Sequence, residues 1–140
     1  MEEVKLTRPL LLIGCGKMGS AMLSGWLESG IATAGVIVVE PMGAPAPFVN
    51  ATNVEIVASA KDLSADLNPE VVVFAVKPQQ MDNVAPAYKR FTSSNTAFLS
   101  IAAGKDIAYF SAKLGKNATI VRAMPNTPAA IGQGITVCCS

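Results

Sequence analysis

Three glycines near the start of the chain have the spacing of a phosphate-binding turn. Gly14, Gly16 and Gly19 form the pattern G-x-G-x-x-G. In that pattern the first glycine allows a tight turn, the second lets the backbone approach a pyrophosphate, and the third lets a helix pack closely on a strand. The N–H groups that begin the helix also offer partial positive charge to phosphates. The pattern predicts a dinucleotide-binding loop, and the alternative is a glycine-rich turn with no ligand.

Three other residues complete this loop, and we assign all of them to cofactor binding. Lys17 starts the helix, where its cation opposes the helix dipole and where a bound pyrophosphate would reverse that penalty. An exposed lysine pointing into solvent explains Lys17 equally well. Cys15 lies at a helix N-terminus, which can acidify a thiol, but we favour a small residue tolerated beneath the loop. Met18 continues the helix at apolar spacing.

An acidic residue follows at the distance typical of a dinucleotide site. Glu40 comes 21 residues after Gly19, at the end of an apolar stretch over Val36–Val39. A carboxylate there accepts hydrogen bonds from the adenosine ribose hydroxyls and repels a 2′-phosphate. Residues 41–60 contain no Lys or Arg that would neutralise such a phosphate. The sequence therefore favours NAD over NADP, and the alternative is a solvated glutamate at the end of a strand.

A second candidate loop follows the clearest central strand. Valine occupies four of the six positions from Val71 to Val76, which is typical of a buried strand. Lys77 and Pro78 end that strand abruptly. Pro78 fixes the turn, so backbone groups of Val76 and Lys77 are better candidates for cofactor contact than the Lys77 ammonium. The alternative for Lys77 is a solvated loop lysine.

Two more loops carry small or polar residues. Ala102 and Ala103 bear almost no side chain, which suits a backbone packed against a flat nicotinamide ring; an ordinary tight turn is the alternative. Asn126 and Thr127 lie between two prolines and are candidate hydrogen-bonding partners of the nicotinamide or its substrate. Proline stiffness alone also explains that loop. We assign Asp106 as a helix cap.

Strands and helices alternate along the whole chain. The expected strands are residues 10–13, 36–39, 54–57, 71–76, 97–101, 119–123 and 134–139. The expected helices are residues 17–29, a brief helix or turn at 61–67, a helix at 79–90 with an interruption at Pro86, and residues 106–114. This order predicts an α/β fold, a doubly wound, mostly parallel Rossmann-type sheet with helices on both faces. Its ligand crevice lies at the carboxyl ends of the strands, and residues 1–8 are expected to form a loose leader.

The composition narrows the classes of function. Of 140 residues, 51% are hydrophobic and 15% are charged, as buried parallel strands require. A net charge of +1 gives no electrostatic case for nucleic acid, and the apolar runs are too short to span a membrane. Three cysteines and no histidine argue against zinc and a disulfide framework, so we expect no metal. The lack of histidine also excludes a Ser-His or Cys-His nucleophile within this chain. The odd number of cysteines, which does not suit a disulfide framework, favours a cytoplasmic location.

Four stretches together resemble the amino-terminal half of pyrroline-5-carboxylate reductases. They are IGCGKMGSAML, FAVKPQQM, LSIAAGK and VRAMPNTPAAIGQGIT, and the resemblance extends from about Leu10 to the end of the chain. It implies one NAD(P)-binding Rossmann domain over residues 1–140 that binds NADPH or NADH. The family's reaction is the reduction of a cyclic imine to L-proline, in proline biosynthesis. The resemblance also implies that the glycine loop binds the pyrophosphate.

The resemblance extends to residue roles and to partners. Ala75, Val76, Lys77 and Pro78 match one cofactor-contacting loop of the family, Ala102 and Ala103 match another, and Asn126 lies beside the nicotinamide and substrate. The chain ends about where a helical dimerisation domain would begin. Catalytic groups are therefore expected largely in that domain, through which family members are homo-oligomers. The expected partner is the small-molecule imine, with neither nucleic acid nor membrane.

The sequence also departs from the family's pattern. Lys17 replaces the usual asparagine, and Glu40 with the proline-rich segment after it replaces a more regular helix. Two alternatives remain beside the reductase. One is a stand-alone dinucleotide-binding or sensor module. The other is the cofactor domain of a β-hydroxyacid-type dehydrogenase, against which the PNTP loop argues.

Overall fold

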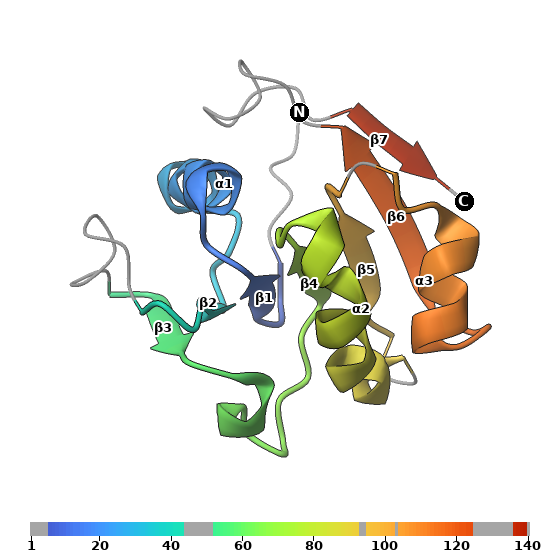
Figure 1. Cartoon of the computed structure of the whole chain (residues 1–140). Helices are drawn as coiled ribbons and strands as arrows, with labels where there is room; N and C mark the ends of the chain where they lie inside the picture. Colours follow the sequence, from blue (N-terminus) through green and yellow to red (C-terminus); the bar gives the residue numbers. More distant parts are fainter. Residues whose placement is uncertain (1–5, 44–51, 93–94, 103, 125–135, 140) are drawn as a thin grey trace.

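A parallel sheet forms the central layer of the molecule, and helices lie on both of its sides (Figure 1). The computed structural model describes residues 6–43, 52–92, 95–102, 104–124 and 136–139. Within these residues the strand order is β3-β2-β1-β4-β5-β6-β7. Neighbouring strands from β3 to β6 pair in parallel, and β7 pairs antiparallel with β6. The predicted doubly wound, mostly parallel α/β fold is confirmed.

The strand bounds agree closely with the sequence prediction. The strands are β1 (Leu10–Ile13), β2 (Val36–Val39), β3 (Val54–Val57), β4 (Val71–Phe74), β5 (Ala97–Ser100), β6 (Thr119–Met124) and β7 (Thr136–Cys139). The main difference is β4, which was expected to continue to Val76. Ala75 and Val76 instead leave the strand and pass against the glycine turn, where a Cβ at Gly14 would meet atoms of both.

The helical segments differ more from the prediction. They are α1 (Lys17–Ser29), α2 (Met81–Val84) and α3 (Ile107–Leu114), with 3-10 turns η2 (Ala60–Asp62), η3 (Pro78–Gln80) and η4 (Ala85–Phe91). α1 ends as expected at Gly30, which adopts φ 72°. The helix expected over residues 79–90 with an interruption at Pro86 is confirmed only in part: the break beside Pro86 is present, but the stretch divides into η3, α2 and η4, and only Met81–Val84 is α-helical. Pro86, in the first turn of η4, has no N–H to continue the α-helical ladder.

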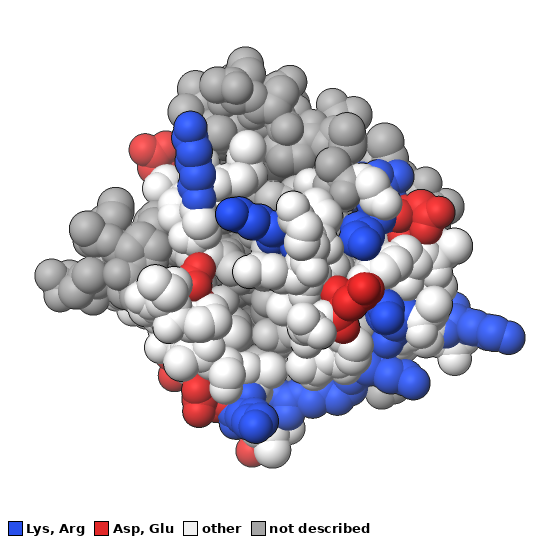
Figure 2. Space-filling model, in the orientation of Figure 1, with Lys and Arg blue, Asp and Glu red and all other residues white. Residues whose placement is uncertain are grey.

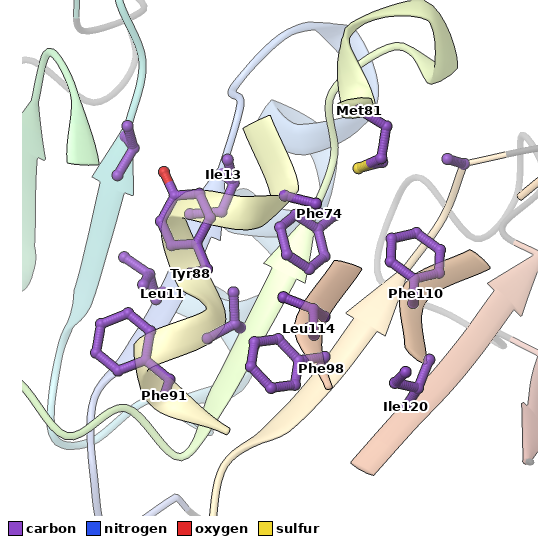
Figure 3. Packing of buried hydrophobic residues seen from close by; sticks show 14 of the residues in the cluster. Leu11, Ile13, Phe74, Met81, Tyr88, Phe91, Phe98, Phe110, Leu114 and Ile120 are labelled. Atoms are coloured by element: carbon purple, nitrogen blue, oxygen red, sulfur yellow. The ribbon is translucent and has the colours of Figure 1, made fainter. Parts of the chain in front are cut away.

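Each face of the sheet has its own apolar core. Leu11 and Ile13 of β1 point into the cluster shared with η4 and α3, whereas Leu10 and Leu12 point into the cluster beneath α1. Phe74 of β4 is central to the first cluster (Figure 3). Its ring centroid lies 5.7 Å from that of Phe110 and 5.8 Å from that of Tyr88.

The predicted loose leader is wrong for residues 6–8. Leu6 is buried, and its N–H donates to the Ile31 carbonyl at 2.8 Å. The backbone N–H groups of Thr7 and Arg8 both donate to Oε1 of Glu70, at 2.8 and 3.1 Å. These bonds attach the segment to the sheet at the amino end of β4.

Candidate dinucleotide-binding site

The three loop glycines have different structural reasons for being glycine. Gly14 adopts φ +90°, and a Cβ there would lie 2.9 Å from Cγ1 of Val76. A Cβ at Gly19 would lie 2.6 Å from the Gly14 carbonyl oxygen. At Gly16 a Cβ would meet no described atom within 4 Å. Packing of the fold therefore requires the first and third glycines, whereas the second faces open space.

The start of helix α1 leaves backbone donors available. Gly16 is its N-cap and supplies no side-chain hydrogen bond, and no acidic residue lies in the first turn. Ser20 N–H is already bonded to the Gly16 carbonyl at 2.8 Å. The N–H groups of the first turn, preceding Ser20, therefore lack a side-chain cap, which is the arrangement that accepts phosphate oxygens.

Cys15 lies beneath the loop, as the sequence favoured. Its side chain is buried, and its sulfur lies 3.5 Å from the Ser20 hydroxyl. Burial raises the pKa of the Cys15 thiol, the Ser20 hydrogen bond opposes that rise, and the nearby Glu40 charge adds to it. The alternative of an acidified thiol is therefore wrong.

The carboxylate of Glu40 is fixed against the glycine loop. Its Oε1 accepts a hydrogen bond from the backbone N–H of Cys15 at 2.9 Å. Its Oε2 accepts one from the backbone N–H of Met42 at 3.1 Å. The side chain is half-buried, so both oxygens are held at the carboxyl end of β2, beside the turn that follows β1.

A cleft of about 650 Å³ lies between these elements. Among the residues assigned to cofactor binding, it brings together Gly14, Gly16, Glu40, Ala75, Val76 and Lys77. Its described lining includes only two charged residues, Glu40 and Lys77. On the face shown in Figure 2, Lys and Arg are most numerous toward the lower and right-hand edges, and others lie at the upper left and just above the centre.

Other assigned residues lie outside this lining. Lys17 is exposed, Met18 packs against the core beneath α1, and Gly19, in the first turn of α1, is buried. Pro78 starts η3, where it fixes the turn as expected. Ala102 is buried, and its N–H donates to the Ser100 hydroxyl at 3.1 Å. The remaining assigned residues, Ala103, Asn126 and Thr127, lie outside the described residues.

Sequence reasoning missed one wall of the cleft. It is formed by Gln80, Asn83, Val84 and Ala87, with Tyr88 beside them. The first four are spaced i, i+3, i+4 and i+7, the spacing of one helical face. That periodicity is visible in the sequence, directly after the loop at residues 75–78 that the sequence assigns to cofactor contact. A second wall, at Ala58–Ala60 after β3, has no sequence pattern that would have predicted its place in the cleft.

Two features are absent from the part of the chain that the structure describes. No group of three or more His, Cys, Asp or Glu side chains there is placed to hold a metal ion. No described helix is both long and apolar enough to cross a membrane.

The chain is similar to an oxidoreductase family and to several named reductases. The family described as "NADP oxidoreductase coenzyme F420-dependent" matches residues 10–104. Pyrroline-5-carboxylate reductase of Mycobacterium tuberculosis H37Rv is 38% identical over 133 residues, which cover 91% of this chain and 44% of the relative. The reductase of Escherichia coli K12 is 34% identical over 127 residues, or 89% of this chain and 46% of the relative.

Two of the matching solved structures are also pyrroline carboxylate reductases. Plasmodium falciparum pyrroline carboxylate reductase, solved with NADP bound, has a TM-score of 0.78 at 26% identity and covers 97% of this chain and 49% of its own. The Coxiella burnetii pyrroline-5-carboxylate reductase has a TM-score of 0.77 at 28% identity, with coverages of 94% and 48%. The chain therefore spans about half the length of the relatives it matches.

Proposed function

The chain belongs to the family described as NADP oxidoreductase, coenzyme F420-dependent, and from this membership we propose that it is the cofactor-binding portion of a pyrroline-5-carboxylate reductase. Relatives of that name match about nine-tenths of the chain. The observation that carries the proposal is the cleft in which Gly16 and Glu40 lie together. It combines open space at the second glycine with a carboxylate at the end of β2.

The residues of the cleft fit a nicotinamide dinucleotide. The glycine loop from Gly14 to Gly19 would hold the pyrophosphate, because its open second glycine and uncapped helix start suit that group. Glu40 would accept hydrogen bonds from the adenosine ribose. We assign Ala75–Pro78 and Ala102–Ala103 to the nicotinamide side, and Asn126 with Thr127 to the neighbourhood of the substrate.

The chemistry itself belongs to the cofactor. When bound, NADPH or NADH supplies a hydride that reduces the imine carbon of 1-pyrroline-5-carboxylate, giving L-proline. This chain binds and orients the dinucleotide. A protonated imine is already electrophilic, so a strong general acid is less necessary than in ketone reduction, which is compatible with a chain that has no histidine. Most groups that orient the imine, and the homo-oligomer interface, are proposed to lie outside these 140 residues, and the enzyme to be cytoplasmic.

Calorimetric titration of the 140-residue chain with NADH and NADPH tests the proposal. We expect saturable binding of at least one of them. If neither binds, the proposed function is refuted. A parallel assay of proline formation separates binding from turnover. Low activity is expected, and robust activity of this chain alone would contradict the assignment of the imine-orienting groups to a region outside it.

A further inference from the structure

We propose that Glu40 makes this cleft select dinucleotides whose adenosine ribose carries no 2′-phosphate, so that the chain binds NADH in preference to NADPH. The inference rests on the proposed function, since it requires a dinucleotide in the cleft. It also sets this chain apart from its family's description as NADP oxidoreductases and from the relative solved with NADP.

The first argument is that the Glu40 carboxylate is held in place. Oε1 is bonded to the N–H of Cys15 and Oε2 to the N–H of Met42. Swinging the side chain away to admit a phosphate would break both bonds and leave two backbone donors without their partner. Each carboxylate oxygen still has a lone pair for a ribose hydroxyl, because a carboxylate accepts up to about four hydrogen bonds. The arrangement therefore accommodates a hydroxyl donor and opposes an anion.

The second argument is the charge of the wall beside Glu40. The described lining on the β2 and β3 side consists of uncharged residues at positions 39, 41, 42 and 58–60 in addition to Glu40. Residues 41–60 contain neither Lys nor Arg. A phosphate monoester carries about −1.5 to −2 charge at neutral pH. A 2′-phosphate would face the carboxylate there without a cation among the described lining residues of this wall.

The cation that does line the cleft lies on a different strand. Lys77 follows β4, and the sheet order places β1 between β2 and β4. Because neighbouring strands lie about 5 Å apart, the backbones of β2 and β4 are about 10 Å apart. The Lys77 backbone therefore starts about two strands away from the ribose position that Glu40 marks. Lys61, exposed just after the lining residue Ala60, is the rival cation that the test must exclude.

The test compares calorimetric dissociation constants of NADH and NADPH for the 140-residue chain at low ionic strength. We expect NADH to bind at least about tenfold more tightly, equivalent to about 1.4 kcal/mol. Because charge repulsion is screened by salt, this ratio should shrink as ionic strength rises. Equal binding, or tighter binding of NADPH, would overturn the inference and leave the proposed function standing. Binding of neither would overturn both.

Three variants test whether the charge of Glu40 causes the preference for NADH over NADPH. Glu40→Gln should narrow the ratio, chiefly by strengthening NADPH binding. Glu55→Gln removes the same charge from an exposed position on β3 outside the cleft, and should leave the ratio unchanged. Lys61→Ala should also leave it unchanged, and a selective loss of NADPH affinity there would count against the inference. The wild-type ratio decides the question even if Glu40→Gln folds poorly.

Discussion

Gly19 lies so close to Gly14 that a Cβ at position 19 would be 2.6 Å from the Gly14 carbonyl oxygen. The same Cβ would lie 3.4 Å from the Cβ of Ala75. Three segments distant in sequence therefore meet at one point: the turn after β1, the first turn of α1 and the loop after β4. This contact sets the position of the helix start and thereby one wall of the cleft.

Replacement of Gly19 by alanine should destabilise the fold. The atom that the new methyl group meets is backbone, so α1 or the turn after β1 must move. Overpacking of this kind costs about 1–3 kcal/mol. Urea denaturation followed by circular dichroism measures the loss, and an unchanged midpoint would show that the helix and turn adjust without strain. Dinucleotide binding should weaken as well, because the loop is displaced.

Gly16→Ala is the matched variant, with the opposite pattern expected. No described atom lies within 4 Å of the added methyl group, and the backbone φ of −74° suits alanine. Loss of a glycine N-cap should cost at most about 1 kcal/mol. The methyl group projects where a pyrophosphate would approach, so dinucleotide affinity should fall at least about tenfold. If calorimetry shows that the variant binds the dinucleotide with unchanged affinity, the pyrophosphate does not lie beside Gly16.

The residues that could be predicted from sequence are those whose roles depend on local chemistry. The valines of β4, the left-handed Gly30 and the cap at Asp106 all act within a few residues of their own position. The fold class followed from the order of such elements. Val76 and Lys77, in the loop after β4, followed from the strand and the proline that ends it, and the family resemblance added Ala75; all three line the cleft.

What sequence reasoning missed depends on contacts between distant residues. The bond from Cys15 to Glu40 spans 25 positions, and no local pattern reports it. The attachment of residues 6–8 depends on Glu70, more than 60 positions away. The division of residues 78–91 into η3, α2 and η4 reflects both Pro86 and the burial of Tyr88 and Phe91 against the sheet. Only the proline was visible in advance.

Asp106→Ala should weaken helix α3 specifically. The Asp106 carboxylate accepts a hydrogen bond from the N–H of Tyr109 at 2.8 Å, and losing such a cap costs about 1 kcal/mol. Asp66→Ala is the control, because the exposed Asp66 carboxylate has no hydrogen bond within the part of the chain that the structure describes. Thermal unfolding should show a lower midpoint for the first variant alone. Equal shifts would mean that net charge, and not the cap, is responsible.

The contact between Tyr109 and Asp82 should shift the ionisation of the Tyr109 phenol to higher pH. The Tyr109 hydroxyl donates to Asp82, whose carboxylate also lies 3.6 Å from Nζ of Lys113. The pKa of Tyr109 is raised from 10.0 to about 12. Desolvation is the largest cause, and the hydrogen bond to Asp82 and the charge of Asp82 add to it. Burial raises the pKa of Tyr88 to about 12 as well. Since the chain has two tyrosines, ultraviolet absorbance should show neither phenol ionising near its ordinary pKa.

The linked change in stability has a defined sign. Both tyrosine pKa values are higher in the folded state, so their contribution is complete below pH 10 and is lost as pH rises from about 10 to 12. Asp82→Asn removes the negative charge facing Tyr109 and should lower the pKa of that phenol while leaving Tyr88 unchanged. Because both phenols otherwise ionise near pH 12, about half of the absorbance rise should then move to lower pH. If the whole rise moves to lower pH, the variant has loosened the core around Tyr88, and the pairing of Tyr109 with Asp82 is not the cause.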